Sequence, residues 1–425
     1  MNFLLKFKSC TEYVVLPIWY LLDRFVKKKP SYWGFPVHFS DSTKFIENPR
    51  AVFEHIKKDV TLKKILFYRD SHNGFEIDDT VNYELVQLHS FRGLYLLMQC
   101  KVLFVSNAIS WDFTLRWNND TKYSIIRMDM QSRHVVNLWH GIPLKQILSL
   151  WNTDLRDRYN KISYRKYERE NYSMIPASSK VDGYVMAAVF HPIDPKKVIP
   201  LGLPKNDFLL KTDVELPSYI LNQLIKIREL KKSKKLILYA PTHRQTDAVK
   251  DAAYYNFSKE DIRSLKDFLK NNNAILGVRM HYLRKGVNRF PAEQLIDNEF
   301  IFDLGNRLIP EIAPCIIESD IIITDYSSLY LDAVYLNKPV FSFAYDLEHY
   351  SKHQDGLIYD MDFAFPGPIV KEFKKLIEAL NKEIHNFNQC EAEKYKMIRE
   401  MFFDTIDANN ALRLIEKLKS ELKIV

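Results

Sequence analysis

The chain has 425 residues, 47% of them hydrophobic; it is too long for one ordinary core and too apolar for a disordered chain, so we expect two globular domains. The 11 glycines form neither a GxGxxG nor a GxxxxGK(S/T) pattern, and the four cysteines lie far apart, which argues against a Gly-rich phosphate loop, a disulfide framework and a cysteine-based zinc site. The net charge of +8 is compatible with a nucleic acid, an acidic substrate or a membrane surface as partner.

Residues 1–30 combine aromatic and aliphatic side chains with six basic and only two acidic residues, so half of the net charge lies here. The longest apolar run, residues 13–22, has about half the length that spans a bilayer, and Pro17 interrupts it. We interpret residues 1–30 as a segment that lies in a membrane interface. The alternative is an ordinary N-terminal helix that packs on the following domain.

Residues 31–215 alternate short apolar runs with amphipathic stretches, which predicts a first α/β domain. The stretch 151–170 is rich in charged and aromatic residues, and we interpret it as a surface excursion toward a polyanionic or lipid-bound substrate, with a solvated helix as the alternative. Strands are expected at 63–68, 101–105, 133–138, 171–175 and 197–200, and helices at 85–98 and 180–189.

A second α/β domain is assigned to residues 216–368; it opens with a helix and a lysine-rich turn at 216–235, a plausible linker, and the alternating series follows. The pattern beyond residue 370 is helical only, so residues 369–425 are predicted to form C-terminal helices. Within the second series, strands are expected at 236–239, 274–278 and 300–302, and helices at 261–270 and 307–319.

The stretch 316–343 predicts a βαβ unit: a β-branched strand at 321–323, a polar turn at 325–328, a helix at 329–336 and a strand at 339–343. Parallel sheets bind ligands at the carboxyl ends of their strands, where this turn would lie. Ser327 and Ser328 at the helix start would form a phosphate-binding site, because their hydroxyls add donors to the free N–H groups of the helix. In the alternative interpretation, a serine only caps the helix and Asp325 only satisfies the turn.

Three further polar clusters follow predicted strands, in residues 140–145, 241–244 and 279–281. His140 has a ring that titrates near neutrality, Gly141 allows close approach of a ligand, and Lys145 is suited to phosphate. Arg244 and Arg279 are forked donors for phosphate oxygens. Taken singly, the histidine is better explained as a satisfied strand-end residue, and each arginine as a surface ion pair. Asp346, His349 and His353 have metal-like spacing but lack the HExxH glutamate, and we assign no metal ligands.

Taken in order, these clusters resemble the motifs of the CDP-glycerol glycerophosphotransferase family, the teichoic acid polymerases and primases. The resemblance covers about residues 134–368 and departs from the family pattern at Ile142, where threonine is usual, at Lys205, where arginine is commoner, and at His243, where an aromatic residue is common. The matching segments are HGIPLK at 140–145, GLPKND at 202–207, YAPTHR at 239–244, RMH at 279–281, ITDYSS at 323–328, NKP at 337–339, and YDLEHY at 345–350 followed by the glycine of DGL at 355–357.

The resemblance implies an α/β protein of GT-B type, with two Rossmann-like domains that face a cleft and C-terminal helices. The domain of residues 31–215 would hold the acceptor and the base, and the domain of residues 216–368 would hold the CDP-linked donor. Such enzymes are peripheral proteins of the cytoplasmic face of the membrane, which strengthens the membrane interpretation of residues 1–30.

The implied reaction transfers an alditol phosphate, sn-glycerol phosphate from CDP-glycerol, to a hydroxyl of a lipid-linked or polymeric glycan and releases CMP, without a covalently bound cofactor. A CDP-ribitol donor and a GT-B nucleotide-sugar glycosyltransferase are the alternatives, and metal dependence, oligomeric state and the acceptor stay open. A nucleic-acid partner is not expected, because the basic residues accompany no readout motif. The resemblance makes His140 and His281 catalytic, and it assigns substrate binding to Gly141, Lys145, Lys205, Asp207, Pro241, Thr242, Arg244, Arg279, Asp325, Ser327 and Ser328.

Overall fold

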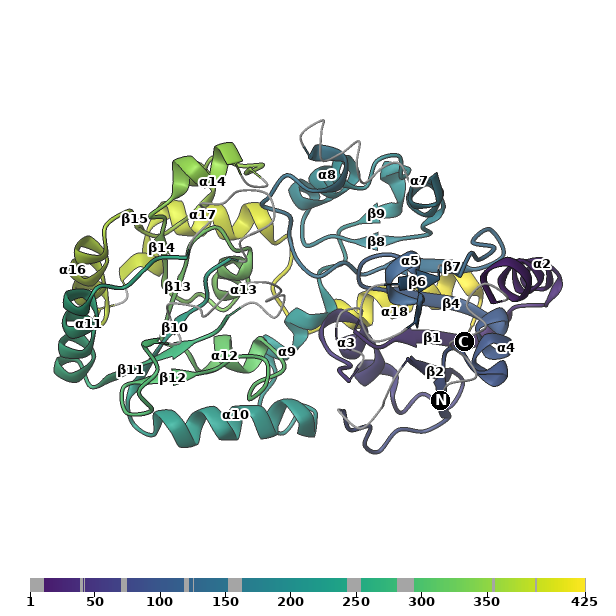
Figure 1. The fold of residues 1–425 in the computed structure, drawn as a ribbon, viewed down its shortest axis with the longest axis horizontal. Helices are drawn as coiled ribbons and strands as arrows, with labels where there is room; N and C mark the ends of the chain where they lie inside the picture. Colours follow the sequence, from purple (N-terminus) through teal and green to yellow (C-terminus); the bar gives the residue numbers. More distant parts are fainter. Residues whose placement is uncertain are drawn as a thin grey trace. The chain divides into compact units, whose positions relative to one another are not determined.

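The protein is described by a computed structural model that covers residues 11–38, 41, 43–69, 75–117, 122–124, 126–151, 163–242, 254–280, 294–353, 356–386 and 388–424. Its internal contacts divide the chain into two compact units (Figure 1). The first unit comprises Met1–His140, Thr153–Asp207 and Asn409–Val425, and the second comprises Gly141–Asn152 and Phe208–Ala408.

The first unit contains a parallel five-stranded sheet with the order β3-β2-β1-β4-β7. Numbered within the sheet, this is the order 3-2-1-4-5 of a Rossmann-like fold. A short parallel pair, β8 and β9, continues beyond β7 through a bridge between Val136 and Met174. The strands are β1 (Lys29–Pro36), β2 (Lys63–Tyr68), β3 (Tyr83–Gln87), β4 (Cys100–Val105), β7 (His134–Asn137), β8 (Ile175–Pro176) and β9 (Val198–Ile199).

Helices connect these strands, and a small antiparallel hairpin of β5 (Leu115–Trp117) and β6 (Lys122–Ser124) lies outside the main sheet. The helical elements of the first unit are η2 (Thr11–Val15), α2 (Leu16–Phe25), α3 (Glu47–Ile56), α4 (Phe91–Gln99), α5 (Ile109–Asp112), α7 (Ser163–Asn171), α8 (Lys180–Val189), η5 (Pro195–Lys197), η6 (Pro204–Asn206) and α18 (Asn410–Leu422).

The second unit contains a parallel six-stranded sheet with the order β12-β11-β10-β13-β14-β15, which is the order 3-2-1-4-5-6 of a Rossmann fold. Its strands are β10 (Lys235–Tyr239), β11 (Ala274–Val278), β12 (Ile301–Asp303), β13 (Ile321–Thr324), β14 (Val340–Phe343) and β15 (Ile369–Val370). Its helical elements are η4 (Leu148–Leu150), α10 (Ser218–Lys231), α11 (Lys259–Asn271), α12 (Ala313–Glu318), α13 (Leu329–Tyr335), α14 (Leu347–His353), α15 (Met361–Ala364), α16 (Phe373–Glu383), η8 (Asn388–Glu391) and α17 (Glu393–Phe402), while α9 (Asp207–Leu210) begins at the boundary.

Each sheet is buried by apolar side chains on its faces, as parallel sheets require. In the first unit, Phe35 and Phe104 stack at 4.8 Å between ring centroids, and Trp33 packs against the same cluster. In the second unit, Ile237, Ile321 and Ile323 from the two central strands pack with the apolar faces of α11 and α16. The prediction of two Rossmann-like parallel-sheet domains is confirmed.

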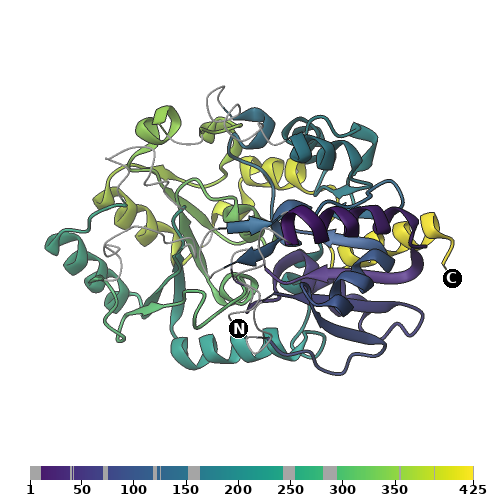
Figure 2. The same ribbon diagram turned by 45° about the vertical axis from the view of Figure 1, so that its right-hand side comes forward.

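Helix α2 lies on the outside of the first unit in both views (Figures 1 and 2). Its buried face consists of Leu16, Trp19 and Asp23, which follow one another at helical spacing. Trp19 Nε1 donates to the carbonyl of Leu94 at 3.0 Å, which ties α2 to α4. The alternative interpretation of this segment, a helix that packs on the following domain, is correct for this face.

Helix α18 ends the described chain but belongs to the first unit, where it packs against α3 and η6 (Figure 1). Leu414, Ile415 and Leu418 are buried in the same core as the strands of the first sheet. The sequence pattern groups all helices of residues 369–425 together. The contacts instead place α18 in the first unit and the other C-terminal helices in the second. They also place the boundary between the units after Asp207 rather than after residue 215.

Several predicted elements need correction. The expected helix 85–98 is instead strand β3 followed by α4, because residues 83–87 pair with β2 and Ser90 caps the helix by accepting from Gly93 N at 2.9 Å. The expected helix 307–319 is only α12, and the expected strand 171–175 begins at Ile175 because α7 continues through Asn171. Strand β1 was not predicted, since its two prolines and one glycine conceal the strand pattern.

The charged excursion at 151–170 lies partly outside the described residues. Its described part is α7, in which Glu168 and Arg169 are buried, so this part of the stretch is a packed helix rather than a fully solvated one.

Candidate active site

The turn after β13 lies where the strand order of the second unit reverses, between β10 and β13. The backbone N–H of Thr242, which follows β10, donates to Asp325 Oδ1 at 2.8 Å, and the N–H of Tyr326 donates to the same oxygen at 2.6 Å. Asp325 is buried, and Pro241 leads into Thr242 at the adjacent strand end. The carboxylate thus joins two strand ends at the switch point, which is where open α/β sheets bind their ligands.

Ser327 and Ser328 stand at the start of α13, and both are only partly buried. Ser328 occupies the N-cap position, yet its side chain accepts no hydrogen bond from a helix N–H, and Leu329 N approaches Ser327 Oγ only to 3.4 Å. The interpretation of a serine as a simple cap therefore explains the two hydroxyls poorly. Their position leaves them suited to donate to an oxygen-rich ligand.

The segment 141–146 packs on the second unit although His140 belongs to the first. A Cβ added to Gly141 would lie 3.5 Å from Ser328 Oγ, so this glycine and the serine turn are neighbours. Lys145 pairs with Leu357 in an isolated antiparallel bridge, and Ile358 N donates to Leu144 O at 2.8 Å. These contacts hold Gly141 and the backbone of Lys145 in the same unit as Thr242, Asp325 and the two serines.

His140 is exposed and follows a turn that is held on both sides. Trp139 N donates to Asn137 Oδ1 at 2.9 Å, and Asn48 Nδ2 donates to Trp139 O at 2.9 Å. The imidazole lies against the indole of Trp139, with 4.0 Å between the ring centroids. An exposed ring on a fixed backbone is a suitable geometry for a general base.

The GLPKND element holds α18 in place. Gly202 has a φ of +84°, and a Cβ there would lie 1.7 Å from Asn410 Oδ1. Asp207 is buried and accepts from Asn410 N at 2.8 Å and Ala411 N at 2.9 Å, the first N–H groups of the helix. Lys205 N donates to Asn48 Oδ1 at 2.9 Å, so Asn48 joins this element to the His140 turn. A structural role is therefore visible for Asp207, while its predicted substrate contact stays a prediction.

Arg279 is buried beneath the loop that follows β12. Its guanidinium donates to the carbonyls of Leu304 at 2.8 Å, Ile309 at 2.6 Å and Pro310 at 3.2 Å. The side chain thus organises the loop 304–310, which also explains why no helix forms before α12. Direct contact of Arg279 with phosphate stays a prediction.

Arg244 and His281, predicted to bind substrate and to act in catalysis, lie outside the described residues. Within the described ranges, no group of three or more histidine, cysteine, aspartate or glutamate side chains is arranged to hold a metal ion. Asp346 instead accepts from the hydroxyl of Tyr326 at 2.9 Å, which braces the serine turn from behind.

Three residues near the site were not predicted: Asn48, Asn137 and Gln146. Asn137 gives a weak local signal, because an asparagine whose side chain bonds the backbone two residues on is a common turn former. Asn48 gives none, since it lies 91 residues from the carbonyl that it holds. Gln146 Nε2 donates to Leu357 O at 3.3 Å, which reinforces the bridge at Lys145.

Comparison with known proteins identifies the same family. The family model of CDP-Glycerol:Poly(glycerophosphate) glycerophosphotransferase matches residues 26–420. The teichoic acid poly(glycerol phosphate) polymerase of Bacillus spizizenii is 28% identical over 356 residues, which cover 81% of this chain and 82% of the relative. The teichoic acid ribitol-phosphate polymerase TarL of Staphylococcus aureus is 27% identical over 372 residues, which cover 86% of this chain and 59% of the relative.

Among solved structures, the wall teichoic acid polymerase TagF matches with a TM-score of 0.73 at 19% identity, and the match covers 96% of this chain and 93% of that chain. This likeness shows the fold, which is GT-B-like. Since the family model spans nearly the whole chain, the protein is a phosphotransferase that belongs to the CDP-glycerol:poly(glycerophosphate) glycerophosphotransferase family.

Proposed function

We propose that the protein transfers sn-glycerol phosphate from CDP-glycerol to a hydroxyl of a membrane-linked glycan or of a growing poly(alditol phosphate), with release of CMP. The observation that carries this proposal is the switch-point turn of the second unit. There Asp325 joins two strand ends, while two serine hydroxyls and Gly141 leave polar groups and space for a phosphate.

In the proposed reaction the acceptor hydroxyl attacks the β-phosphorus of the donor. His140 takes the proton of that hydroxyl, the new phosphodiester bond forms, and the bond to the bridging oxygen breaks, so that CMP leaves with the electron pair. Ser327 and Ser328 donate to a phosphate oxygen, and Thr242 and Asp325 orient the donor.

Positive charge around the pyrophosphate would come from Lys145, Lys205, Arg244, Arg279 and His281, which would stabilise the charge on the transferring group by positioning and electrostatics. The charge of Arg279 would act through the loop that it holds, because its N–H groups already donate to carbonyls. The second histidine, His281, is proposed to assist departure of CMP.

A CDP-ribitol donor is the nearest alternative. The ribitol-phosphate polymerase TarL is 27% identical and the poly(glycerol phosphate) polymerase 28%, so identity alone favours neither alditol. A GT-B glycosyltransferase is a more distant alternative; it would attack a sugar carbon and leave the phosphorus on the nucleotide.

The deciding experiment measures CMP released by the purified protein with CDP-glycerol or CDP-ribitol, each with and without a lipid-linked glycerophosphate primer. Primer-dependent CMP from one donor, with its phosphorus retained in the product, establishes the transferase and names the donor. Release of nucleoside diphosphate from a nucleotide sugar, without CMP from either alditol donor, would overturn the proposal.

We also infer that α2 lies in the interface of the cytoplasmic membrane, so that the protein is peripheral on its cytoplasmic face. None of the helices in the described part of the chain has the length and apolar character to cross a bilayer. The face of α2 opposite Trp19 and Asp23 is apolar and exposed: Ile18, Leu21, Leu22 and Phe25 have 53%, 56%, 48% and 80% of their surface accessible. Such a face beside basic residues is typical of interfacial helices.

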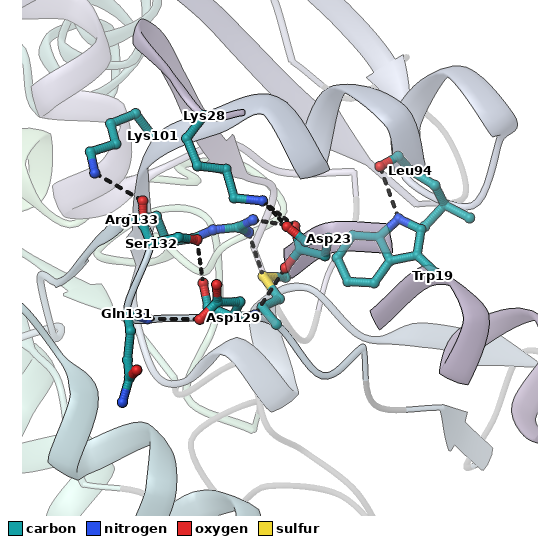
Figure 3. Close-up of polar contacts among 10 residues, drawn as sticks. Trp19, Asp23, Lys28, Leu94, Lys101, Asp129, Gln131, Ser132 and Arg133 are labelled. Carbon is teal, nitrogen blue, oxygen red and sulfur yellow. Dashed lines mark hydrogen bonds and ion pairs between the residues drawn. The ribbon is translucent and has the colours of Figure 1, made fainter. Parts of the chain in front are cut away.

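The buried side of α2 is fixed by charge as well as by packing (Figure 3). Asp23 is fully buried and pairs with Lys28 at 2.8 Å and with the guanidinium of Arg133, and it accepts from Asp129 N at 2.9 Å. Arg133 immediately precedes β7, so α2 is anchored to the strand that leads to His140. The apolar face is therefore presented by a rigid element, while exposed Arg24, Lys27 and Lys29 are available to anionic headgroups.

Sedimentation with phosphatidylglycerol vesicles tests this inference. The double variant Ile18→Asp and Phe25→Asp is expected to lose most of its binding, because two charges would enter the acyl boundary. Val60→Asp, at a 70% exposed apolar residue elsewhere on the first unit, is the control and should bind as the unchanged protein does. Equal binding of both variants would refute the role of α2.

A further inference from the structure

Trp139, the residue before the proposed base, has an unusual backbone conformation. Its φ is +49°, and among the described residues it is the one aromatic residue in the left-handed region. Bulky residues rarely adopt this conformation, which costs about 1–3 kcal/mol and persists only where the surroundings impose it. Glu47, which precedes Asn48, also has a positive φ of 62°. The residue before Asn48 and the residue whose carbonyl Asn48 holds thus both have a left-handed backbone conformation.

The hydrogen bonds at Trp139 impose this conformation from both sides. Asn137 Oδ1 accepts from Trp139 N at 2.9 Å, and Asn48 Nδ2 donates to the carbonyls of Trp139 at 2.9 Å and Leu138 at 3.3 Å. Both asparagines are fully buried. Asn137 is itself fixed, because its Nδ2 donates to Asn107 O at 2.9 Å. Trp139, the residue before His140, is therefore held at its N–H and at its carbonyl by buried amide side chains.

The indole of Trp139 is fixed as well. It packs edge-on against Phe190, with 5.1 Å between the centroids and an interplanar angle of 87°. On the other side its face lies 4.0 Å from the imidazole of His140, at an angle of 35°. Only 8% of the Trp139 surface is accessible, whereas His140 is exposed. The indole is thus a buried platform for an exposed ring.

We propose that Asn48 and Trp139 are positioning residues for His140: Asn48 holds the turn that aims the imidazole, and the indole face supports it and stabilises its protonated form. This proposal rests on the proposed role of His140 as general base. When His140 takes the proton of the acceptor hydroxyl, the resulting imidazolium lies over the electron-rich face of an aromatic ring, which attracts cations. The strain at Trp139 places the ring in that position.

The same amide of Asn48 extends the arrangement to the GLPKND element, since its Oδ1 accepts from Lys205 N at 2.9 Å. One buried side chain therefore sets the position of the proposed base and of a proposed cationic contact to the substrate. If the turn at Trp139 served only folding, it would not need to place the exposed imidazole of His140 on the indole. It would also not need Asn48 to hold both this turn and Lys205 N.

The first test compares Asn48→Ala with Val52→Ala. Both residues are fully buried on α3, but Val52 makes no bond to the His140 turn, so it controls for lost stability. CMP release should show kcat reduced about 10- to 100-fold in Asn48→Ala, because misplacement of a catalytic group by about 1 Å has an effect of this size, while loss of the bond to Lys205 N should change KM less. Val52→Ala should keep its kcat. Equal kcat in the two variants would overturn the role of Asn48.

The second test needs no activity. In protein with ¹³C-labelled histidine, the His140 signal is identified by its loss in His140→Gln and is then titrated with pH. In Trp139→Leu its titration midpoint should fall by about 0.4–0.7 pH units, the equivalent of a cation–π contact of about 0.5–1 kcal/mol, and Trp139→Phe should restore most of the shift. An unchanged midpoint in Trp139→Leu would overturn the platform role.

The two proposals fail in distinguishable ways. If the unchanged protein releases no CMP from either donor, the proposed function fails, while the titration still tests the platform. If the unchanged protein is active and His140→Gln remains fully active, the base role fails. If His140→Gln is inactive but Asn48→Ala and Trp139→Leu keep full kcat, only the positioning proposal fails.

Discussion

Each unit of this protein has a polar turn after one strand of its parallel sheet, β7 in the first unit and β13 in the second, and the two turns do opposite things. After β7 in the first unit, buried asparagines force a bulky residue into a strained conformation and present a titratable ring to solvent. After β13 in the second unit, a buried aspartate satisfies two backbone N–H groups and leaves hydroxyls at a helix start. The comparison shows how the same kind of strand end can present a proposed proton acceptor in the first unit and a proposed anion-binding site in the second.

The most direct test of this difference between the two turns is to remove the imidazole of His140. His140→Gln should reduce kcat by about 10²- to 10⁴-fold, the usual contribution of a positioned general base, with little effect on folding because the side chain is exposed. CMP release measures the loss. His385→Gln, at another exposed histidine, is the matched control and should remain active. Comparable activity of the two variants would remove the chemical distinction between the turns.

The second turn is expected to depend on its carboxylate for folding. Asp325→Ala would leave the N–H groups of Thr242 and Tyr326 buried without their acceptor and should lower the free energy of unfolding by about 2–4 kcal/mol. Urea denaturation followed by circular dichroism measures it. Asp303→Ala, at an exposed residue in the same unit, should have a smaller effect. A loss below 1 kcal/mol would mean that Asp325 is not the organising group of this turn.

The hydroxyls should matter for substrate and not for folding. Ser328→Ala is expected to lower kcat/KM for the donor about 5- to 30-fold, the equivalent of one lost hydrogen bond of about 1–2 kcal/mol, with unchanged thermal stability. Initial rates of CMP release against donor concentration test this. Ser264→Ala, at an exposed serine of α11, should change nothing. If instead stability fell and kinetics did not change, the capping interpretation of Ser328 would be restored.

The last expected effect concerns two buried carboxyls of the first unit, Glu168 and Asp112. Glu168 is buried and accepts from Ser110 N at 2.8 Å, and burial raises its pKa from its usual 4.5 to about 8. The folded protein therefore binds more protons than the unfolded chain between these values, so the free energy of unfolding should fall as pH rises from 4.5 toward 8. The slope is on the order of 1 kcal/mol per pH unit at most.

Glu168→Gln should remove the upper part of this dependence, because an amide keeps the bond to Ser110 N and does not ionise. Asp112, whose pKa burial raises to about 6, would still contribute below that pH. Urea unfolding at several pH values between 5 and 8.5 distinguishes the two proteins. Parallel curves would show that Glu168 ionises in the folded protein as an exposed glutamate does.

Sequence patterns were enough to place His140 and Asp325 at the ends of buried strands, where parallel sheets bind ligands, but their roles were assigned from the family resemblance and stay predictions. They did not reveal what Arg279 and Asp207 do. Both residue types suggest phosphate or substrate contact, yet in the structure their side chains are occupied by backbone groups. The role of Asn48 could not be predicted from the sequence, since its partner Trp139 lies 91 residues away and no local pattern indicates a contact over that distance.

The placement of α18 bears on how the protein is made. The chain leaves the first unit at Asp207, completes the second, and returns at Asn409. A ribosome therefore synthesises the whole second unit before it supplies Leu414 and Leu418, which are fully buried in the core of the first. Until then the first sheet lacks part of its cover, although N-terminal domains ordinarily fold first during synthesis. The N-terminal unit of this protein is consequently completed only after the second unit has been synthesised.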